Sequence, residues 1–205
     1  KFQLQFICLL KFYFCRMKWI GNRISYQDHN NYFTLIISGK TEDWKFNLML
    51  VWAFAWLFCG VSVIYMLFFS EELKDQQLYY TTFLVFWAYF FYKISKSIIW
   101  RKFGIEYIKI DDDFLTIKKS LWSYGKAKKF MIGNITSFKQ IDLNQKSFAK
   151  VFNDSFWVVG QPTLNVNVDN EIINFGAQVS DIEGKKLIKI LNKRLNNFKS
   201  IGKPK

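Results

Sequence analysis

The sequence predicts an α+β membrane protein in which a two-helix transmembrane hairpin is followed by an antiparallel β sandwich or barrel, closed by a C-terminal amphipathic helix. Three observations predict this class: two long apolar blocks in the first half of the chain, short β-type runs between turn residues in the second half, and an amphipathic helical pattern at the end. We therefore divide the chain into an N-terminal segment at 1–40, a transmembrane hairpin at 41–100 and a β domain at 101–205.

The composition is that of a folded chain. The 205 residues are 51% hydrophobic and 20% aromatic, which excludes a disordered or collagen-like protein. The mean hydropathy of +0.01 averages the apolar blocks against a second half rich in Lys and Asn. Three Cys residues cannot supply a disulfide framework, so we expect no disulfide to hold the fold.

The first apolar block covers residues 46–69 and contains no charged residue. As a helix it would be about 36 Å long, which exceeds the roughly 30 Å of a hydrocarbon core. Thr41, Glu42 and Asp43 lie just before it and suit a helix N-terminus. We predict a transmembrane helix that begins near Thr41.

The second apolar block covers residues 78–100 and is free of charge as far as Tyr92. Lys93 and Lys96 follow, and near a helix end such side chains can lie along lipid while their ammonium groups reach the phosphates. The alternative, a buried core helix of a soluble protein, fits poorly because core helices rarely stay uncharged for so long. We predict a second membrane span.

The distribution of basic residues predicts the orientation of the hairpin. Lys and Arg are frequent in residues 1–45 and again in 93–102, whereas the connector at 70–77 holds only Lys74 among three acidic residues. The positive-inside rule then places both termini in the cytoplasm. We expect a multi-pass membrane protein with a hairpin anchor.

Residues 1–16 begin without Met, and Met17 is a plausible translation start. We expect residues 1–16 not to be native; the alternatives are a fragment whose true start is missing, or a short apolar anchor. The apolar run before Lys11 is too short to span a membrane, and no small-residue cleavage site follows it, so we predict no signal peptide.

The β domain is predicted from short runs with strand-like composition and turn residues between them. A hairpin is expected around Asp111, Asp112 and Asp113, and the closing helix is expected from Ser180, which forms a capping box with Glu183. The expected strands are 105–110, 114–119, 127–132, 135–141, 148–152, 156–159, 164–168 and 171–175.

This order of strands and a closing helix resembles small bacterial membrane proteins that join a two-helix hairpin to a bacterial pleckstrin-homology (PH)-like domain. The resemblance covers about residues 44–198. The features that carry it are the Trp-bearing first span, Trp100-Arg101-Lys102 before the first strand, residues 157–162 and 173–176, and the helix from Ser180. It implies a cytoplasmic PH-like domain at 101–205, usually with no known activity, and it supplies no catalytic residues.

Motifs for nucleotide or metal chemistry are incomplete. Gly39-Lys40-Thr41 lacks the earlier glycine of a P-loop, because position 34 is Thr. His29 is the only histidine and has no partner nearby in sequence for a metal site or a catalytic pair. The three aspartates at 111–113 lack calcium-loop spacing and are read as a solvated turn. We predict no enzyme, no cofactor and no metal.

Basic residues next to the second span are the candidate lipid-facing groups. They are Arg101, Lys102, Lys126, Lys128 and Lys129, which could attract an anionic membrane surface. The loop that usually forms the phosphoinositide pocket of PH domains corresponds to residues 111–113, so phosphoinositide binding is not expected. The lysines are scattered through the strands and the aromatic residues concentrate elsewhere, so nucleic-acid binding is not expected either.

The aromatic residues of the two spans admit one further hypothesis. Trp52 and Trp56 lie one turn apart on the first span, and aromatic residues dominate the second. Such a face could hold a pigment, a quinone or a lipid tail, although aromatic belts and helix packing explain most of it.

These observations lead to a functional expectation. We expect a membrane-anchored PH-like scaffold or assembly factor that binds an unknown protein partner at the cytoplasmic membrane face. The alternatives are a sensor of anionic lipid or envelope stress, or an accessory subunit of a larger membrane complex; homo-oligomerisation remains open as well.

Overall fold

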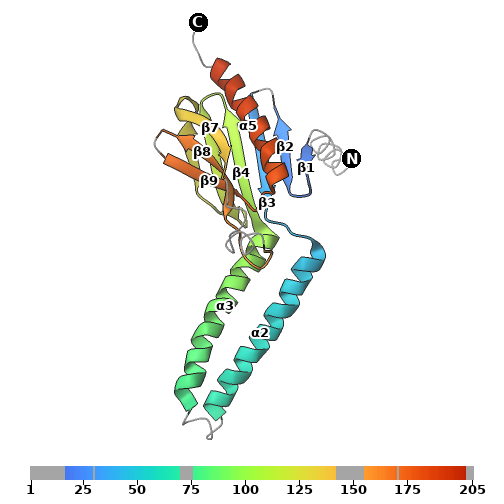
Figure 1. The fold of residues 1–205 in the computed structure, drawn as a ribbon, viewed down its shortest axis with the longest axis vertical. Coiled ribbons are helices and arrows are strands. Elements are labelled where there is room, and N and C mark those ends of the chain that lie inside the picture. The colour runs from blue at the N-terminus through green and yellow to red at the C-terminus, as the bar shows by residue number, and fades with distance from the viewer. Residues whose placement is uncertain (1–16, 30, 70–75, 142–154, 170, 202–205) are drawn as a thin grey trace, which may run out of the picture.

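Two long antiparallel helices project from one end of a β domain in the computed structural model, which describes residues 17–29, 31–69, 76–141, 155–169 and 171–201 (Figure 1). The elements are β1 (Lys18–Ile20), β2 (Ile24–Asp28), β3 (Tyr32–Ser38), α2 (Asp43–Phe69), α3 (Gln77–Phe103), β4 (Gly104–Asp111), β5 (Phe114–Leu121), β6 (Ala127–Met131), a 3₁₀ turn η2 (Ile132–Asn134), β7 (Ile135–Gln140), β8 (Pro162–Val168), β9 (Glu171–Ala177) and α5 (Asp181–Ile201). The architecture is therefore α+β with antiparallel sheets.

The strands form two sheets around one core. A six-stranded sheet has the order β1-β2-β3-β4-β5-β6, and a three-stranded sheet has the order β7-β8-β9. Inward side chains of both sheets share one hydrophobic cluster, which includes Phe33, Ile108, Phe138 and Val166. Neither sheet closes into a barrel among the described strands, so the sandwich form of the prediction is the one that fits.

The N-terminal segment is part of the large sheet, which differs from the predicted boundary at residue 40. β3 pairs antiparallel with β4 along its whole length, from Tyr32 opposite Asp111 to Ser38 opposite Ile105. The burial of β3 alternates along the strand, because every second side chain faces the core. The helix pair is therefore inserted between two neighbouring strands of one sheet.

The two long helices meet the requirements for a membrane span to different degrees. Each contains 27 residues, but in the described part of the chain only α2 is long and apolar enough to cross a membrane by length and composition. α3 carries several Tyr residues together with Lys93 and Lys96, which lower its hydropathy. α2 begins at Asp43 rather than Thr41, since Phe46 N donates to Glu42 O.

The closing helix α5 covers the core as predicted. Leu187, Leu191 and Leu195 are buried in the common cluster, and Ser180 forms the capping box with Glu183, each accepting a bond from the backbone N–H of the other. Asn192 also bonds β7 directly: its Oδ1 accepts from Phe138 N at 2.9 Å and its Nδ2 donates to Phe138 O at 3.0 Å. The helix thus completes one end of the small sheet.

Most of the predicted strands are present, with two exceptions. Residues 156–159 form a turn and bend instead of a strand. The predicted strand at 148–152 and the segment 1–16 lie outside the described residues. The β4–β5 hairpin turns at Asp111, whose Oδ1 accepts from Phe114 N at 2.7 Å; this turn lies at the end of β4 that is remote from α3.

Candidate functional site

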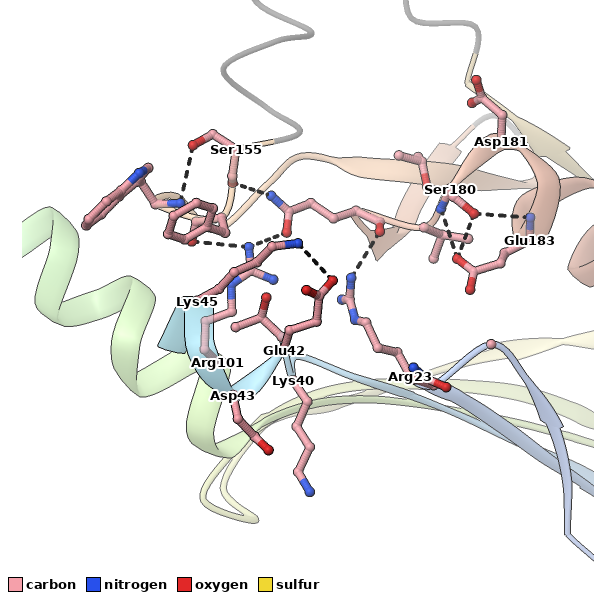
Figure 2. A pocket seen from close by; sticks show the side chains of 18 of the residues that line it. Arg23, Lys40, Glu42, Asp43, Lys45, Arg101, Ser155, Ser180, Asp181 and Glu183 are labelled. Carbon is pink, nitrogen blue, oxygen red and sulfur yellow. Dashed lines mark hydrogen bonds and ion pairs between the residues drawn. The ribbon is translucent and has the colours of Figure 1, made fainter. Parts of the chain in front are cut away.

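A cleft of about 1050 Å³ lies where the helices join the β domain. Its walls are the β1–β2 turn at residues 21–23, the start of α2 at residues 40–45, the loop at residues 155–157 and the start of α5 at residues 179–183 (Figure 2). These segments are distant in sequence and meet because the strands that carry them end at the same edge of the sandwich.

Arg101, from the last turn of α3, is buried at the base of the cleft with 4% of its surface exposed. Its Nη1 donates to Gly39 O at 3.4 Å, and its Nη2 donates to Phe156 O at 3.4 Å, to Val158 O at 3.2 Å and to Gln178 Oε1. One guanidinium therefore holds together the start of α2, the 155–160 loop and the end of β9.

The charge of Arg101 is held by neutral acceptors. All four groups that it contacts are carbonyl oxygens. Burial, with a further contribution from the positive charge of Arg23, lowers the pKa of Arg101 to about 10. Arg101 is therefore expected to be cationic at neutral pH, and the base of the cleft is electropositive.

Gln178 connects the two arginines of the cleft. Its backbone lies in the left-handed region at φ 54°, which directs its carbonyl oxygen to Arg23 Nη1 at 3.1 Å and its side chain to Arg101. Its Nε2 donates to Ser155 O at 2.9 Å. A non-glycine residue in this conformation is uncommon, and here these bonds retain it.

Arg23 occupies the opposite side of the cleft. It donates to Ser38 O at 3.0 Å as well as to the 177–178 backbone. Burial lowers the pKa of Arg23, while the nearby carboxylates of Glu183 and Glu106 oppose that shift. Gly21 beside it has a φ of 61°, in the left-handed region that glycine adopts without strain.

The charges that line the cleft are balanced, unlike those of the chain as a whole, whose net charge is +13. The basic side chains of the lining are Arg23, Lys40, Lys45 and Arg101; the acidic side chains are Glu42, Asp43, Asp181 and Glu183. A site for a phosphate group would be expected to carry an excess of positive charge. This balance suits a ligand that offers both signs of charge, such as a polypeptide.

An aromatic wall joins the 155–160 loop to α2. Phe156 lies 6.4 Å from Trp44 between ring centroids, and Trp157 lies 5.6 Å from Trp52 with the rings nearly perpendicular. Trp52 is more than two turns inside α2. The loop that sequence analysis treated as a strand is therefore held against the helix.

The five predicted lipid-facing residues do not form one site. Arg101 is buried rather than facing lipid, because distant backbone carbonyls enclose its guanidinium. Lys102 is exposed, with its Nζ 5.5 Å from the ring centroid of Phe46. Lys128 and Lys129 are exposed on β6, the edge strand of the large sheet, and Lys126 is exposed just before it.

The position of β6 places Lys129 far from the end of α3. Lys129 lies opposite Thr116, which lies opposite Lys109, five residues after Gly104 at the start of β4. That is roughly 17 Å along the strand, which exceeds the Debye length of about 8 Å at physiological ionic strength. Charges at such edge positions also discourage unwanted strand pairing.

The aromatic residues of the two helices hold the helices together. Trp56 Nε1 donates to Trp87 O at 3.3 Å and Trp87 Nε1 donates to Trp56 O at 2.7 Å. Gly60 gives the Trp87 ring its space, because a Cβ there would lie 2.0 Å from Trp87 Cε2. The cavity between the helices measures only about 180 Å³, which is below the usual size of a cofactor site.

His29 is the remaining polar candidate of the sequence analysis. His29 stacks on Tyr32 at 4.1 Å between ring centroids. Within the described ranges, no group of three or more His, Cys, Asp or Glu residues could hold a metal ion. No local pattern in the sequence predicts the cleft, since its lining residues come from seven separate stretches of the chain.

No family model matches the sequence, and no curated protein matches it.

Proposed function

We propose that the chain is a membrane-anchored, PH-like scaffold or assembly factor that binds a protein partner at the cytoplasmic face of a bacterial inner membrane and has no catalytic activity of its own. The observation that carries the proposal is the cleft, which opens beside the first turn of α2 and has a charge-balanced lining. The occupant would be a segment of polypeptide at the membrane surface, for example one next to a partner's own membrane span.

The pairing of β3 with β4 supports a hairpin anchor. β3 precedes α2 and β4 follows α3, yet the two strands are hydrogen-bonded neighbours. If α2 crosses the membrane, the chain must return before β4 begins, and α3 is the helix available for that return. The reciprocal bonds between Trp56 and Trp87 compensate for the modest hydropathy of α3, because they bury polar groups against its neighbour.

The junction is stiff enough to present a binding surface. α3 continues directly into β4 at Gly104, and Gly39 N donates to Gly104 O at 2.8 Å. Arg101 adds bonds to the 155–160 loop and to Gln178. A preformed cleft of this kind loses little conformational entropy when it binds a partner.

Crosslinking in native membranes tests this proposal. A photoreactive amino acid at position 40 lies in the cleft, whereas one at position 113 lies on the exposed turn at the remote end of the sheet. We expect a discrete protein adduct from position 40 and none from position 113. Reversing the charge in the variant Lys40→Glu should lower the adduct yield from a photoreactive group at position 181 by about tenfold.

Two results would contradict the proposal. Equal adducts from positions 40 and 113 would show that the cleft is not the binding surface. Adducts with lipid alone would instead favour a sensor of anionic lipid, which is the second candidate function because the chain is strongly basic.

A further inference from the structure

The turn between β5 and β6 places aromatic residues in an unusual backbone conformation. We call residues 121–124, which are Leu, Trp, Ser and Tyr, the β5–β6 tip. Leu121 and Tyr124 exchange both backbone hydrogen bonds, at 2.8 and 3.0 Å, and Trp122 and Ser123 between them have φ values of 53° and 68°. This is a two-residue hairpin turn of the kind that normally carries Asn-Gly.

A bulky residue such as Trp122 has an unfavourable conformational energy in this turn, and the connection of two strands does not by itself require it. A bulky residue with positive φ is a genuine outlier, and such strain persists mostly where a site requires it. The side chains also stay exposed, with 65% of Trp122 and 85% of Tyr124 accessible. The strained conformation therefore displays two aromatic side chains that the protein core does not use.

The tip lies at the level where α3 leaves the helix pair. Leu121 is the register partner of Gly104, the first residue after α3. The Trp122 ring lies 4.5 Å from the ring of Phe103, the last residue of α3. Residues 122–123 extend one step beyond that level, toward the helices, because β5 runs antiparallel to β4.

Two lysines flank the tip. Lys118 reaches toward it, with its Nζ 3.0 Å from Ser123 O, and Lys126 follows it in an exposed position. Trp and Tyr favour the membrane–water interface, where one part of the ring is apolar and another is wet. Basic residues beside them favour anionic headgroups.

We propose that the β5–β6 tip inserts into the headgroup region of the membrane that α2 crosses, with anionic phospholipid as its ligand. This inference rests on the proposed membrane anchorage and adds to it a contact made by the β domain itself. With both the helix pair and the tip in contact with the bilayer, the β domain would be held in one orientation against it, with the cleft at the membrane surface.

The test uses the full chain in nanodiscs of phosphatidylethanolamine and phosphatidylglycerol. The cysteines at 8, 15 and 59 are replaced by Ser, and a fluorescent label is attached to one new cysteine at a time. The positions are Ser123→Cys at the tip, Asp112→Cys at the remote turn and Phe58→Cys on the exposed face of α2. Quenching by spin-labelled lipid is compared with quenching by aqueous iodide.

We expect lipid quenching at positions 58 and 123 and iodide quenching at position 112. If the label at 123 behaves as the label at 112 does while position 58 is quenched by lipid, the tip contact is refuted and the anchorage stands. If position 58 is also quenched by iodide, the anchorage fails and the tip contact fails with it.

Two variants separate membrane contact from folding. Trp122→Asn suits the left-handed conformation better than Trp does, so it should keep or raise thermal stability while the label at 123 loses its lipid quenching. Lys118→Gln with Lys126→Gln should shift the ratio of membrane-bound to free tip by about thirtyfold. Unchanged quenching at 123 in both variants would overturn the proposal.

Discussion

Arg101 allows the cost of a buried charge to be weighed against the bonds that it makes. The variant Arg101→Leu removes both. Burial lowers the pKa of Arg101 from its much higher ordinary value to about 10, so keeping the side chain charged in the folded protein costs about 3 kcal/mol. On that term alone, Leu would stabilise the protein.

The hydrogen bonds reverse this expectation. Arg101 serves four acceptors, and bonds to a charged group contribute about 1.5–3 kcal/mol each. We take the low end of that range because three of the four distances are 3.2–3.4 Å. The bonds are then worth about 6 kcal/mol, which leaves Arg101→Leu destabilising by about 3 kcal/mol.

Hydrogen exchange measured by mass spectrometry can locate this loss. We expect the 155–160 loop of Arg101→Leu to exchange about a hundredfold faster than in the unmodified protein, because that loop loses its bonds to Phe156 O and Val158 O. Lys102→Leu changes an exposed neighbour and should leave the loop unaffected. Slower exchange in Arg101→Leu would refute the reasoning, since the cost of the buried charge would then exceed the value of its bonds.

Three more predictions concern the hairpin, the closing helix and the remote turn. Gly60→Ala forces the Trp87 ring away and should weaken the association of α2 with α3 by about 2 kcal/mol, measured by steric trapping. The control Ala55→Val changes an exposed position of α2 and should not weaken it. Equal effects of the two variants would contradict the role of Gly60. Leu191→Asp places a charge in the core, which should lower the stability by several kcal/mol and abolish cooperative thermal unfolding. The exposed control Lys189→Asp should keep a cooperative transition. A cooperative transition retained in Leu191→Asp would mean that α5 is not packed as described. Burial alone would raise the pKa of Asp111, but hydrogen bonds from Lys109 and Phe114 lower it overall, so Asp111 stabilises the fold above the ordinary carboxyl pKa and loses that effect as the pH falls through its lowered value. Asp111→Asn should therefore lower stability by about 1 kcal/mol at pH 7 and leave it unchanged near pH 2, and a constant difference across that range in thermal melts would exclude this carboxylate as the cause.

Local patterns predicted the local elements well. The β4–β5 hairpin follows from a run of turn residues between two strand-like runs, and the capping box of Ser180 and Glu183 is readable from spacing alone. β3 was missed, although the alternation of Phe33, Leu35 and Ile37 with less apolar residues was a usable signal. It lies within residues 1–40, for which the sequence analysis predicts no strand.

The site could not be predicted, because its contacts join distant parts of the chain. Arg101 looks like an interfacial residue in sequence, since it ends an apolar block and precedes Lys102. Its actual acceptors come from positions 39, 156, 158 and 178, and no local pattern relates them. The same holds for residues 156–159, whose apolar composition suggests a strand but whose aromatic rings pack on α2.

The insertion of the helix pair between β3 and β4 also delays the pairing of these two strands during synthesis. Residues 39–103 separate the two strands, so at about 5–20 residues per second β3 waits several seconds for its neighbour. During that interval an edge of β3 is unpaired and open to misassociation.

A fragment that starts at Gly104 would have the reverse defect, since it lacks three of the six strands of the large sheet. A soluble version of the domain therefore needs residues 17–38 joined to 104–201, and the 2.8 Å bond from Gly39 N to Gly104 O indicates that a linker of a few residues can replace the entire hairpin.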